Sequence, residues 1–152
     1  MRRRGFEVVP PQYRKNGEVE IKLPVRASLQ SMAYDFYSPV SRIVKPDEIV
    51  KIWTDVNVYM RADECLILNV RSSMGGKFML ANTQGWIDAD YYMNKDNGGN
   101  KVIFIKKGDR IAQGAFFRFL IADNGNTDNE RNGGFGSTGV WHILGGKCVC
   151  QI

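Results

Sequence analysis

The chain has 152 residues, of which 43% are hydrophobic and 24% charged, and its formal net charge is +5 at pH 7. These values predict one folded domain with a buried core, and they exclude an intrinsically disordered chain. The positive excess is mild, so it predicts a generally basic surface rather than a dedicated nucleic-acid binder. Attraction to a small polyanion, such as a phosphorylated metabolite, is the more specific alternative.

The N-terminal sequence MRRRG is similar to the charged start of a secretion signal. No apolar stretch follows it, because Glu7, Pro10 and Arg14 interrupt the sequence, so we expect no signal peptide and no membrane span. The three cysteines form no spaced framework, which is typical of a reduced cytosolic protein. We therefore expect a cytoplasmic protein whose partners include neither a membrane nor a nucleic acid.

Hydrophobic patterning predicts β-strands along the chain. The alternation in EVEIKLPV predicts the first strand, and β-branched or apolar runs predict the others. The expected strands span residues 18–25, 48–60, 64–70, 101–105 and 115–122. One helical turn is expected near residues 28–33. Many short strands separated by Gly-, Asn- and Asp-rich turns predict a sandwich or a barrel.

Polar motifs follow or precede several of these strands. RSSMGGK (residues 71–77) comes directly after the strand 64–70, and its arginine, hydroxyls, glycines and lysine suit oxyanion binding. In NTQGWIDADYY (residues 82–92), Asp88 and Asp90 flank one residue, which in a strand places both on one face. Paired acids can orient a water or hold magnesium. An ordinary polar turn and a solvated strand end are the alternatives.

Three further motifs complete the set. KKGDRIAQG (residues 106–114) is typical of a hairpin with an internal Asp109–Arg110 pair, and SMAYDFYSP (residues 31–39) holds one aspartate among aromatic residues. NGGFGSTG (residues 132–139) contains the pattern GxGxxG, but it follows a polar loop instead of a strand, which excludes a Rossmann fingerprint. Its glycines and hydroxyls can still let backbone N–H groups approach a phosphate. The alternative is a flexible tail.

In this order, the motifs resemble the five motifs of the trimeric dUTPase family. The resemblance covers residues 26–139 and consists of AYDFYS, RSSMGGK, GWIDADY, GDRIAQ and RNGGFGSTG. The RSS form and the YY after IDAD are most similar to dUTPases of low-GC Gram-positive bacteria and their phages. The resemblance implies an all-β fold, a distorted jelly-roll β-barrel that assembles as a homotrimer. It also implies a β domain over residues 1–125 and a glycine-rich C-terminal arm, or lid, over residues 126–152.

The resemblance implies hydrolysis of dUTP to dUMP and pyrophosphate with Mg²⁺ on the phosphates. Asp88 would be the catalytic carboxylate that orients and deprotonates the water attacking the α-phosphate. Tyr91 would lie against the deoxyribose. Asn82 and the hairpin that follows it would read the uracil edge, and the hairpin residues concerned are Gly85, Trp86 and Ile87.

The resemblance also implies residues for the phosphates, the lid and the metal. Phosphate contacts from a neighbouring subunit would come from Arg71, Ser72 and Ser73, and Gln113 would reach the phosphates too. The lid contacts are implied for Arg131, Phe135, Gly136, Ser137 and Thr138. Asp35 would touch the metal through water, and structural roles are implied for Asp90, Asp109 and Arg110.

Two departures from the family pattern keep other functions open. Trp86 stands where Val or Leu is usual, and the segments around residues 74–78 and 93–102 are shorter than in the relatives. The sister enzyme dCTP deaminase shares RSS and GWID, but KVIFI (residues 101–105) lacks its expected glutamate. A phage-encoded regulator that keeps the nucleotide pocket but acts through a protein partner is the other alternative.

Overall fold

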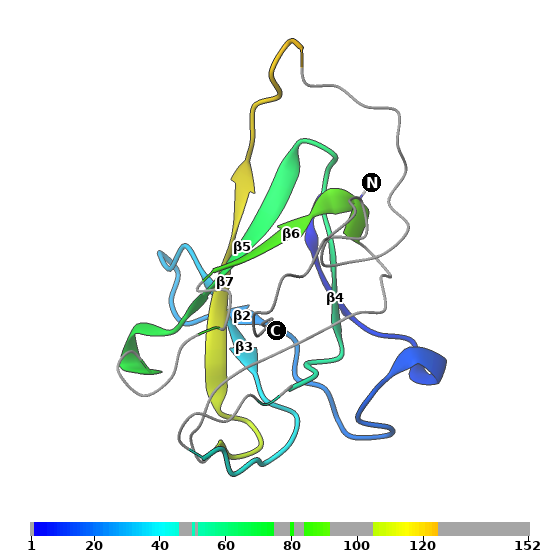
Figure 1. Ribbon diagram of the computed structural model, residues 1–152, viewed down its shortest axis with the longest axis vertical. Coiled ribbons are helices and arrows are strands. Elements are labelled where there is room, and N and C mark those ends of the chain that lie inside the picture. Colours follow the sequence, from blue (N-terminus) through cyan, green and yellow to red (C-terminus); the bar gives the residue numbers. More distant parts are fainter. Residues whose placement is uncertain are drawn as a thin grey trace, which may run out of the picture.

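The computed structural model describes residues 2–45, 50, 52–74, 80, 84–91 and 105–124. These residues form an all-β fold of two antiparallel sheets, which confirms the predicted fold class (Figure 1). The strands are β1 (Gly5–Val8), β2 (Val25–Arg26), β3 (Tyr34–Tyr37), β4 (Val56–Tyr59), β5 (Glu64–Val70), β6 (Gly85–Asp88) and β7 (Arg110–Arg118). Short 3-10 helices span Pro11–Tyr13 (η1), Ser72–Met74 (η2) and Ala89–Tyr91 (η3).

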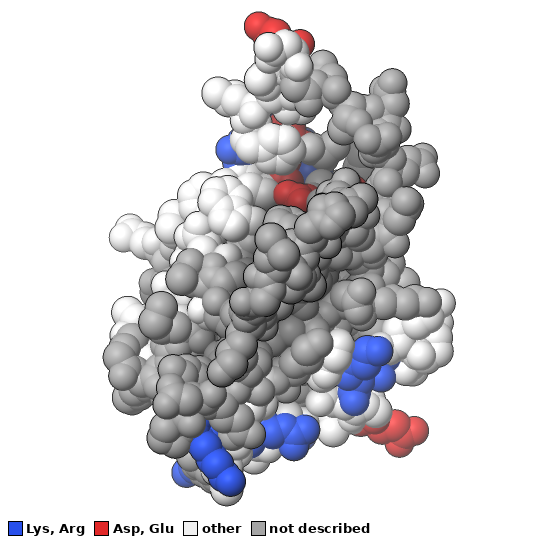
Figure 2. Space-filling view, in the orientation of Figure 1, with Lys and Arg blue, Asp and Glu red and all other residues white. Residues whose placement is uncertain are grey.

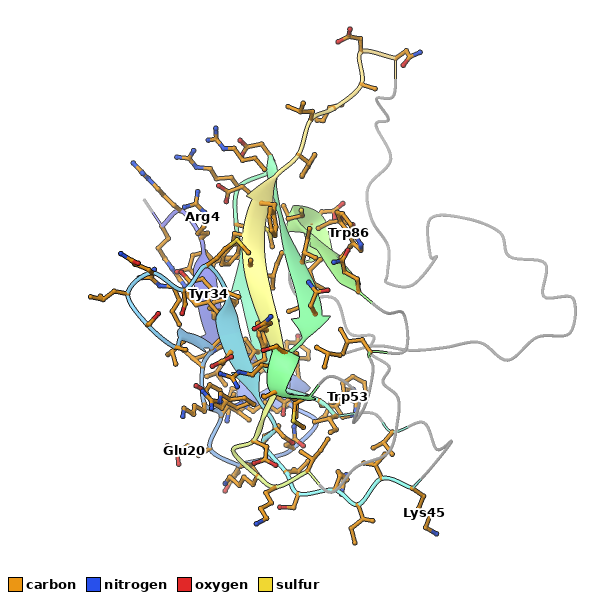
Figure 3. The ribbon with its side chains drawn as sticks, turned by 90° about the vertical axis from the view of Figure 1, so that its left-hand side faces the viewer. Arg4, Glu20, Tyr34, Lys45, Trp53 and Trp86 are labelled. Carbon is orange, nitrogen blue, oxygen red and sulfur yellow. The ribbon has the colours of Figure 1, made fainter. Side chains whose placement is uncertain are left out.

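The larger sheet has the strand order β2-β3-β7-β5-β6, and β1 pairs with β4 in the smaller one. The long strand β7 pairs with β3 on one side and with β5 on the other. It therefore joins two pairs of strands that come earlier in the sequence. In Figure 3 the yellow β7 runs between the green β5 and the cyan β3.

The main core lies between the two sheets. Phe36, Leu66 and Leu68 of the larger sheet are buried there, and Phe6 of β1 and Val58 of β4 pack against this cluster. An edge-to-face aromatic contact joins the two sheets in this core. The ring centroids of Phe6 and Phe36 lie 5.4 Å apart at an interplanar angle of 88°, which is a preferred arrangement for aromatic pairs. The smaller sheet thus covers one face of the larger sheet. The opposite face of the larger sheet does not pack against β1 and β4.

The observed strands confirm part of the expected pattern. β5 spans residues 64–70, as predicted. The strand expected over 115–122 begins five residues earlier and ends at Arg118, because pairing with β3 and β5 extends over residues 110–118. Of the described residues within 48–60, which are 50 and 52–60, only residues 56–59 form a strand. Asp55 just before them has a left-handed φ of 52° that interrupts extended backbone. Residues 101–104 lie outside the described part.

Two expectations near the N-terminus are wrong. The strand expected over residues 18–25 contributes only Val25 to a strand, since β2 spans just two residues. The helical turn expected near 28–33 is a non-helical loop, in which Arg26 Nη1 donates hydrogen bonds to the carbonyls of Leu29 (2.9 Å) and Ser31 (3.4 Å). β1, β3 and β6 lie outside the ranges in which strands are expected. Across the described residues, no helix is long and apolar enough to span a membrane.

Candidate functional site

One face of the larger sheet carries a row of polar side chains. Gln113 of β7 lies opposite Asp35 of β3 and opposite Asn69 of β5. Directly opposed residues project to the same face of a sheet, and the side chain of Gln84 joins the row by donating from Nε2 to Asn69 Oδ1 at 3.0 Å. The row therefore crosses the sheet on the face that does not pack against β1 and β4.

Asp35 lies at one end of this row between two arginines. Its side chain is buried, with 4% of the residue exposed. Arg71 Nε donates to Asp35 Oδ1 at 2.9 Å, and Arg110 Nη1 donates to Asp35 Oδ2 at 3.3 Å. Burial of a carboxylate is costly unless it is paired and hydrogen-bonded, and these contacts meet that need. They also fix two guanidinium groups whose remaining N–H groups can bind an anion.

The residues around Arg71 suit the same role. Arg71 Nη1 donates to Ser73 Oγ at 3.0 Å, and both Ser72 and Ser73 are exposed in η2. The backbone of this turn is closed by a hydrogen bond from Met74 N to the Arg71 carbonyl at 2.8 Å. An arginine fork beside two exposed hydroxyls is a suitable arrangement for phosphate oxygens.

The turn before β7 corrects one interpretation of the sequence. Asp109 accepts a hydrogen bond from Lys106 N to Oδ2 at 2.8 Å, and Gly108 between them has a φ of 89°. Asp109 therefore stabilises the turn, while Arg110 forms its ion pair with Asp35. The expectation of an internal Asp109–Arg110 ion pair is wrong, because Arg110 is the first residue of β7 and pairs instead with Asp35 of β3.

Asp88 lies at the end of β6, on the same face as the polar row. It is exposed and lies opposite Cys65 of β5, and Trp86 lies opposite Ile67. Figure 3 shows Trp86, which is 63% exposed, on the side of the sheet away from Tyr34 and Arg4. Asp90 belongs to η3 and not to β6, so the condition that both carboxylates lie in one strand is not met. The ladder with β5 ends at Asp88, and the chain turns there.

Cys65 shows how near Asp88 lies to the buried part of the sheet. Burial raises the pKa of the Cys65 thiol, and the negative charge of Asp88 raises it further. Cys65 is buried, with 4% of the residue exposed. Asp88 therefore lies opposite a neutral thiol in the neighbouring strand. The sequence patterns did not select Cys65, Asn69 or Gln84, although the two-residue alternation along strands 64–70 and 85–88 would place them beside the predicted site.

The two parts of the site are well separated within one chain. Asp88 pairs with Cys65, and Arg71 follows six residues later along β5. At the rise of an extended strand, that spacing corresponds to about 20 Å. A single phosphate group cannot contact both residues of the same chain at that separation.

Charge is also unevenly distributed between these parts. On the face in Figure 2, most of the coloured Lys and Arg side chains lie toward the lower end, beside an acidic group at the lower right, and most acidic side chains lie toward the upper end. In the same view, β7 begins at the lower end (Figure 1), where Arg110 contacts Asp35. Positive potential at this end favours the approach of a polyanion.

The described residues do not form a metal site of their own. Among them, no group of three His, Cys, Asp or Glu side chains could hold a metal ion. The carboxylate of Asp35 already accepts hydrogen bonds from two guanidinium groups, which weakens its attraction for a cation. Direct coordination of a magnesium ion by Asp35 therefore does not fit this arrangement.

Several predicted residues lie outside the described part of the chain. These are Asn82, Arg131, Phe135, Gly136, Ser137 and Thr138, together with the side chain of Tyr91. Their proposed roles stay predictions. The described residues therefore supply Asp88 at one end of the sheet face and the Arg71 cluster at the other, with Gly85–Ile87 of β6 between them.

Comparisons with known proteins agree with this arrangement. Residues 19–139 match the dUTPase family. The deoxyuridine 5'-triphosphate nucleotidohydrolase of Lactococcus lactis is 40% identical over 92% of this chain and 100% of its own length. The crystal structure of the Streptococcus mutans dUTPase has a TM-score of 0.62 at 30% identity, covering 79% of this chain and 99% of that one. A Staphylococcus bacteriophage 80alpha dUTPase with dUpNHpp has a TM-score of 0.61 at 21% identity, covering 92% of this chain and 100% of that one. These likenesses confirm the jelly-roll barrel.

Proposed function

Because the chain belongs to the dUTPase family, we propose that it hydrolyses dUTP to dUMP and pyrophosphate. The observation that carries the proposal is the position of the five motifs inside the matched residues 19–139. The ion pairs of Asp35 with Arg71 and Arg110, which come from three different motifs, support it. These ion pairs bring residues that are far apart in the sequence together at one place on the sheet.

Asp88 is the proposed general base. Its carboxylate would orient a water molecule and accept the proton as the water oxygen attacks the α-phosphorus. The bond from that phosphorus to the bridging oxygen breaks, and pyrophosphate leaves with the bonding electrons. Exposure of Asp88 at the end of a paired strand supports this role, because a fixed backbone holds the carboxylate in place.

The phosphates would be bound by a second subunit of a homotrimer. Arg71, Ser72 and Ser73 are the proposed phosphate-binding residues, and Gln113 would contribute from the same polar row. The separation of about 20 Å along β5 supports a site shared between chains. Asp109 and Arg110 support the cluster from the turn and the start of β7.

The base, the sugar and the lid complete the proposal. Backbone groups of Gly85–Ile87 with Asn82 would read the uracil edge, Trp86 would border it, and Tyr91 would lie against the deoxyribose. Residues 1–125 would form the β domain and residues 126–152 a lid. The lid residues would be Arg131 on the γ-phosphate, Phe135 on uracil, and Gly136, Ser137 and Thr138 around the triphosphate.

Magnesium would enter with the triphosphate, as the metal-bound form of the substrate. Mg²⁺ commonly binds through phosphates and waters with few protein ligands. That agrees with the lack of a metal-binding cluster among the described residues. A water-mediated contact from Asp35, with Asp90 in a supporting role, stays a prediction.

The test measures pyrophosphate release from dUTP by the purified protein in the presence of magnesium. We expect turnover, and we expect Asp88→Asn to lower kcat by about a thousandfold, within the range for loss of a general base. Asp63→Asn is the control, because Asp63 is half-exposed in a surface pair with Arg118. Lack of pyrophosphate release by the wild-type protein would overturn the proposal.

The same preparation separates the two alternatives. Ammonia release from dCTP would identify a deaminase. A stable protein partner that dUTP displaces, together with negligible turnover, would identify a regulator. Trp86 in the GWID sequence favours the deaminase only weakly, and the match to dUTP nucleotidohydrolases at 40% identity outweighs it.

A further inference from the structure

One contact in the polar row has no role in the proposed mechanism. Gln84 Nε2 donates a hydrogen bond to Asn69 Oδ1 at 3.0 Å. Both side chains are half-buried. The bond lies one residue beyond the last opposed pair of the β5–β6 ladder, Leu68 and Gly85. The two strands are therefore joined by a side-chain hydrogen bond just beyond the point where their backbone pairing ends.

The Asn69–Gln84 hydrogen bond lies next to the residues proposed to recognise the base. Gly85–Ile87 form the start of β6, and their backbone groups are the ones proposed to read the uracil edge. Strand ends fray when nothing holds them, because backbone hydrogen bonds at the end of a ladder open most easily. A side-chain bond one step beyond Gly85 opposes that opening.

Asn69 also connects this end of β6 to the phosphate cluster. It lies opposite Gln113 and two residues before Arg71. Gln113 in turn lies opposite Asp35, to which Arg71 Nε donates. A displacement of Gln84 would therefore act, through Asn69, on β5, which pairs with the base-reading strand β6 and leads into Arg71.

We propose that the Asn69–Gln84 hydrogen bond positions the base-reading end of β6 and so contributes to the selectivity for uracil over cytosine. The inference rests on the proposed function. Asn69 and Gln84 are positioning residues, since they act through the backbone of Gly85–Ile87. Fixed backbone groups reject cytosine only while they are held in place, because hydrogen bonds weaken steeply when their geometry changes.

The experiment compares Asn69→Ala, Gln84→Ala and the double variant, with kcat and KM measured for dUTP and kcat/KM for dCTP. We expect each single variant to raise KM for dUTP about fivefold, which corresponds to about 1 kcal/mol for one hydrogen bond. The selectivity for dUTP over dCTP should fall by about the same factor, with kcat changed less than about twofold. The double variant should resemble the single ones, because both remove the same bond.

Two further variants separate positioning from general destabilisation. The exchanged pair, Asn69→Gln with Gln84→Asn, keeps a donor opposite an acceptor and should restore selectivity. Asn16→Ala is the matched control, because the Asn16 amide donates to the Trp53 carbonyl at 2.8 Å and to Asp55 Oδ2 at 2.7 Å in a loop outside the site. It should lower the melting temperature and leave the selectivity unchanged.

The outcomes distinguish this inference from the proposed function. If the wild-type protein releases no pyrophosphate from dUTP, the proposed function falls and the inference falls with it. If the wild-type protein is active and the single variants keep its KM and selectivity, only the inference is overturned. Independent effects of the two substitutions would overturn it as well. If Asn69→Ala does not fold, Gln84→Ala decides alone, since Gln84 precedes the first residue of β6.

Discussion

At the scale of single residues, two buried carboxylates are compensated in different ways. Asp35 accepts hydrogen bonds from Arg71 and Arg110 at the sheet face that carries the site. Glu64, which is 2% exposed, accepts from both Arg4 Nε, at 3.0 Å, and Arg4 Nη2, and from the backbone N–H of Arg61 at 3.2 Å. The first arrangement fixes cations for a ligand, whereas the second connects β5 to the N-terminal segment.

The Glu64 contact predicts a specific pH dependence of stability. Hydrogen bonding to Arg4 lowers the pKa of Glu64 below its ordinary value of 4.5. The resulting stabilisation is therefore fully present above the unfolded-state pKa and is lost as the pH falls through the lower folded-state pKa. Thermal unfolding measured at decreasing pH should show a steeper loss below about pH 4.5 for the wild-type protein than for Glu64→Gln.

A surface glutamate provides the control for this experiment. Glu7 forms an ion pair with Arg2, whose side chain is 65% exposed. Glu7→Gln should change the pH dependence little, because exposed pairs contribute little to stability. An identical pH dependence for wild type and Glu64→Gln would contradict the assignment.

At the scale of elements, the close packing of β7 against its neighbours depends on a glycine. A Cβ atom added at Gly114 would lie 2.7 Å from Leu68 Cδ2 and 2.9 Å from Phe36 Cε2. Both partners belong to the buried core, where extra atoms force neighbours to shift. The packing of β7 between β3 and β5 therefore leaves no room for a side chain at Gly114.

Gly114→Ala should lower the free energy of unfolding by about 1–3 kcal/mol, the usual cost of overpacking a core. Gly85→Ala is the comparison, because its added Cβ would approach Leu68 Cβ no closer than 3.3 Å. Denaturant unfolding of both variants measures the difference. A larger loss of stability for Gly85→Ala than for Gly114→Ala would show that the predicted packing is wrong.

The elements also show what the sequence could and could not predict. β5 was predicted correctly, because an unbroken apolar run is typical of a strand buried in the middle of a sheet. The alternation over residues 18–25 predicts a strand, but Val25 is the one residue of this range that pairs with β3. Alternation of polar and apolar residues does not specify which strand pairs with which. The contact between Asp35 and Arg71, 36 residues apart, follows from no local pattern, because it joins β3 to the turn after β5. The Asn69–Gln84 bond depends on register, which no local pattern reveals.

At the scale of the whole molecule, the separation of Asp88 from Arg71 makes assembly part of the proposed function. Neither an isolated chain nor a mixture of monomers would bring the two groups to one phosphate. We expect a particle of about three times the 17.2 kDa of one chain, which sedimentation or light scattering can measure.

Complementation between inactive variants tests this sharing directly. Asp88→Asn and Arg71→Ala should each be inactive as a uniform assembly, and the two variants refolded together should regain dUTP hydrolysis. Random mixing would leave about a quarter of the sites with both native groups if they come from different subunits. Mixing either variant with itself is the control. Mixed assemblies that form but remain inactive would place both groups of a site on one chain.

The central position of β7 has a further consequence for synthesis of the protein. β7 is the last strand of the described chain, yet it lies between β3 and β5, which emerge from the ribosome before it. Until residues 110–118 follow, the two hairpins β2–β3 and β5–β6 have no strand to join them and expose edges that can pair with other chains. A translation product that stops before Arg110 would keep both hairpins unjoined. The nascent chain therefore has a higher risk of aggregation until β7 has been synthesised.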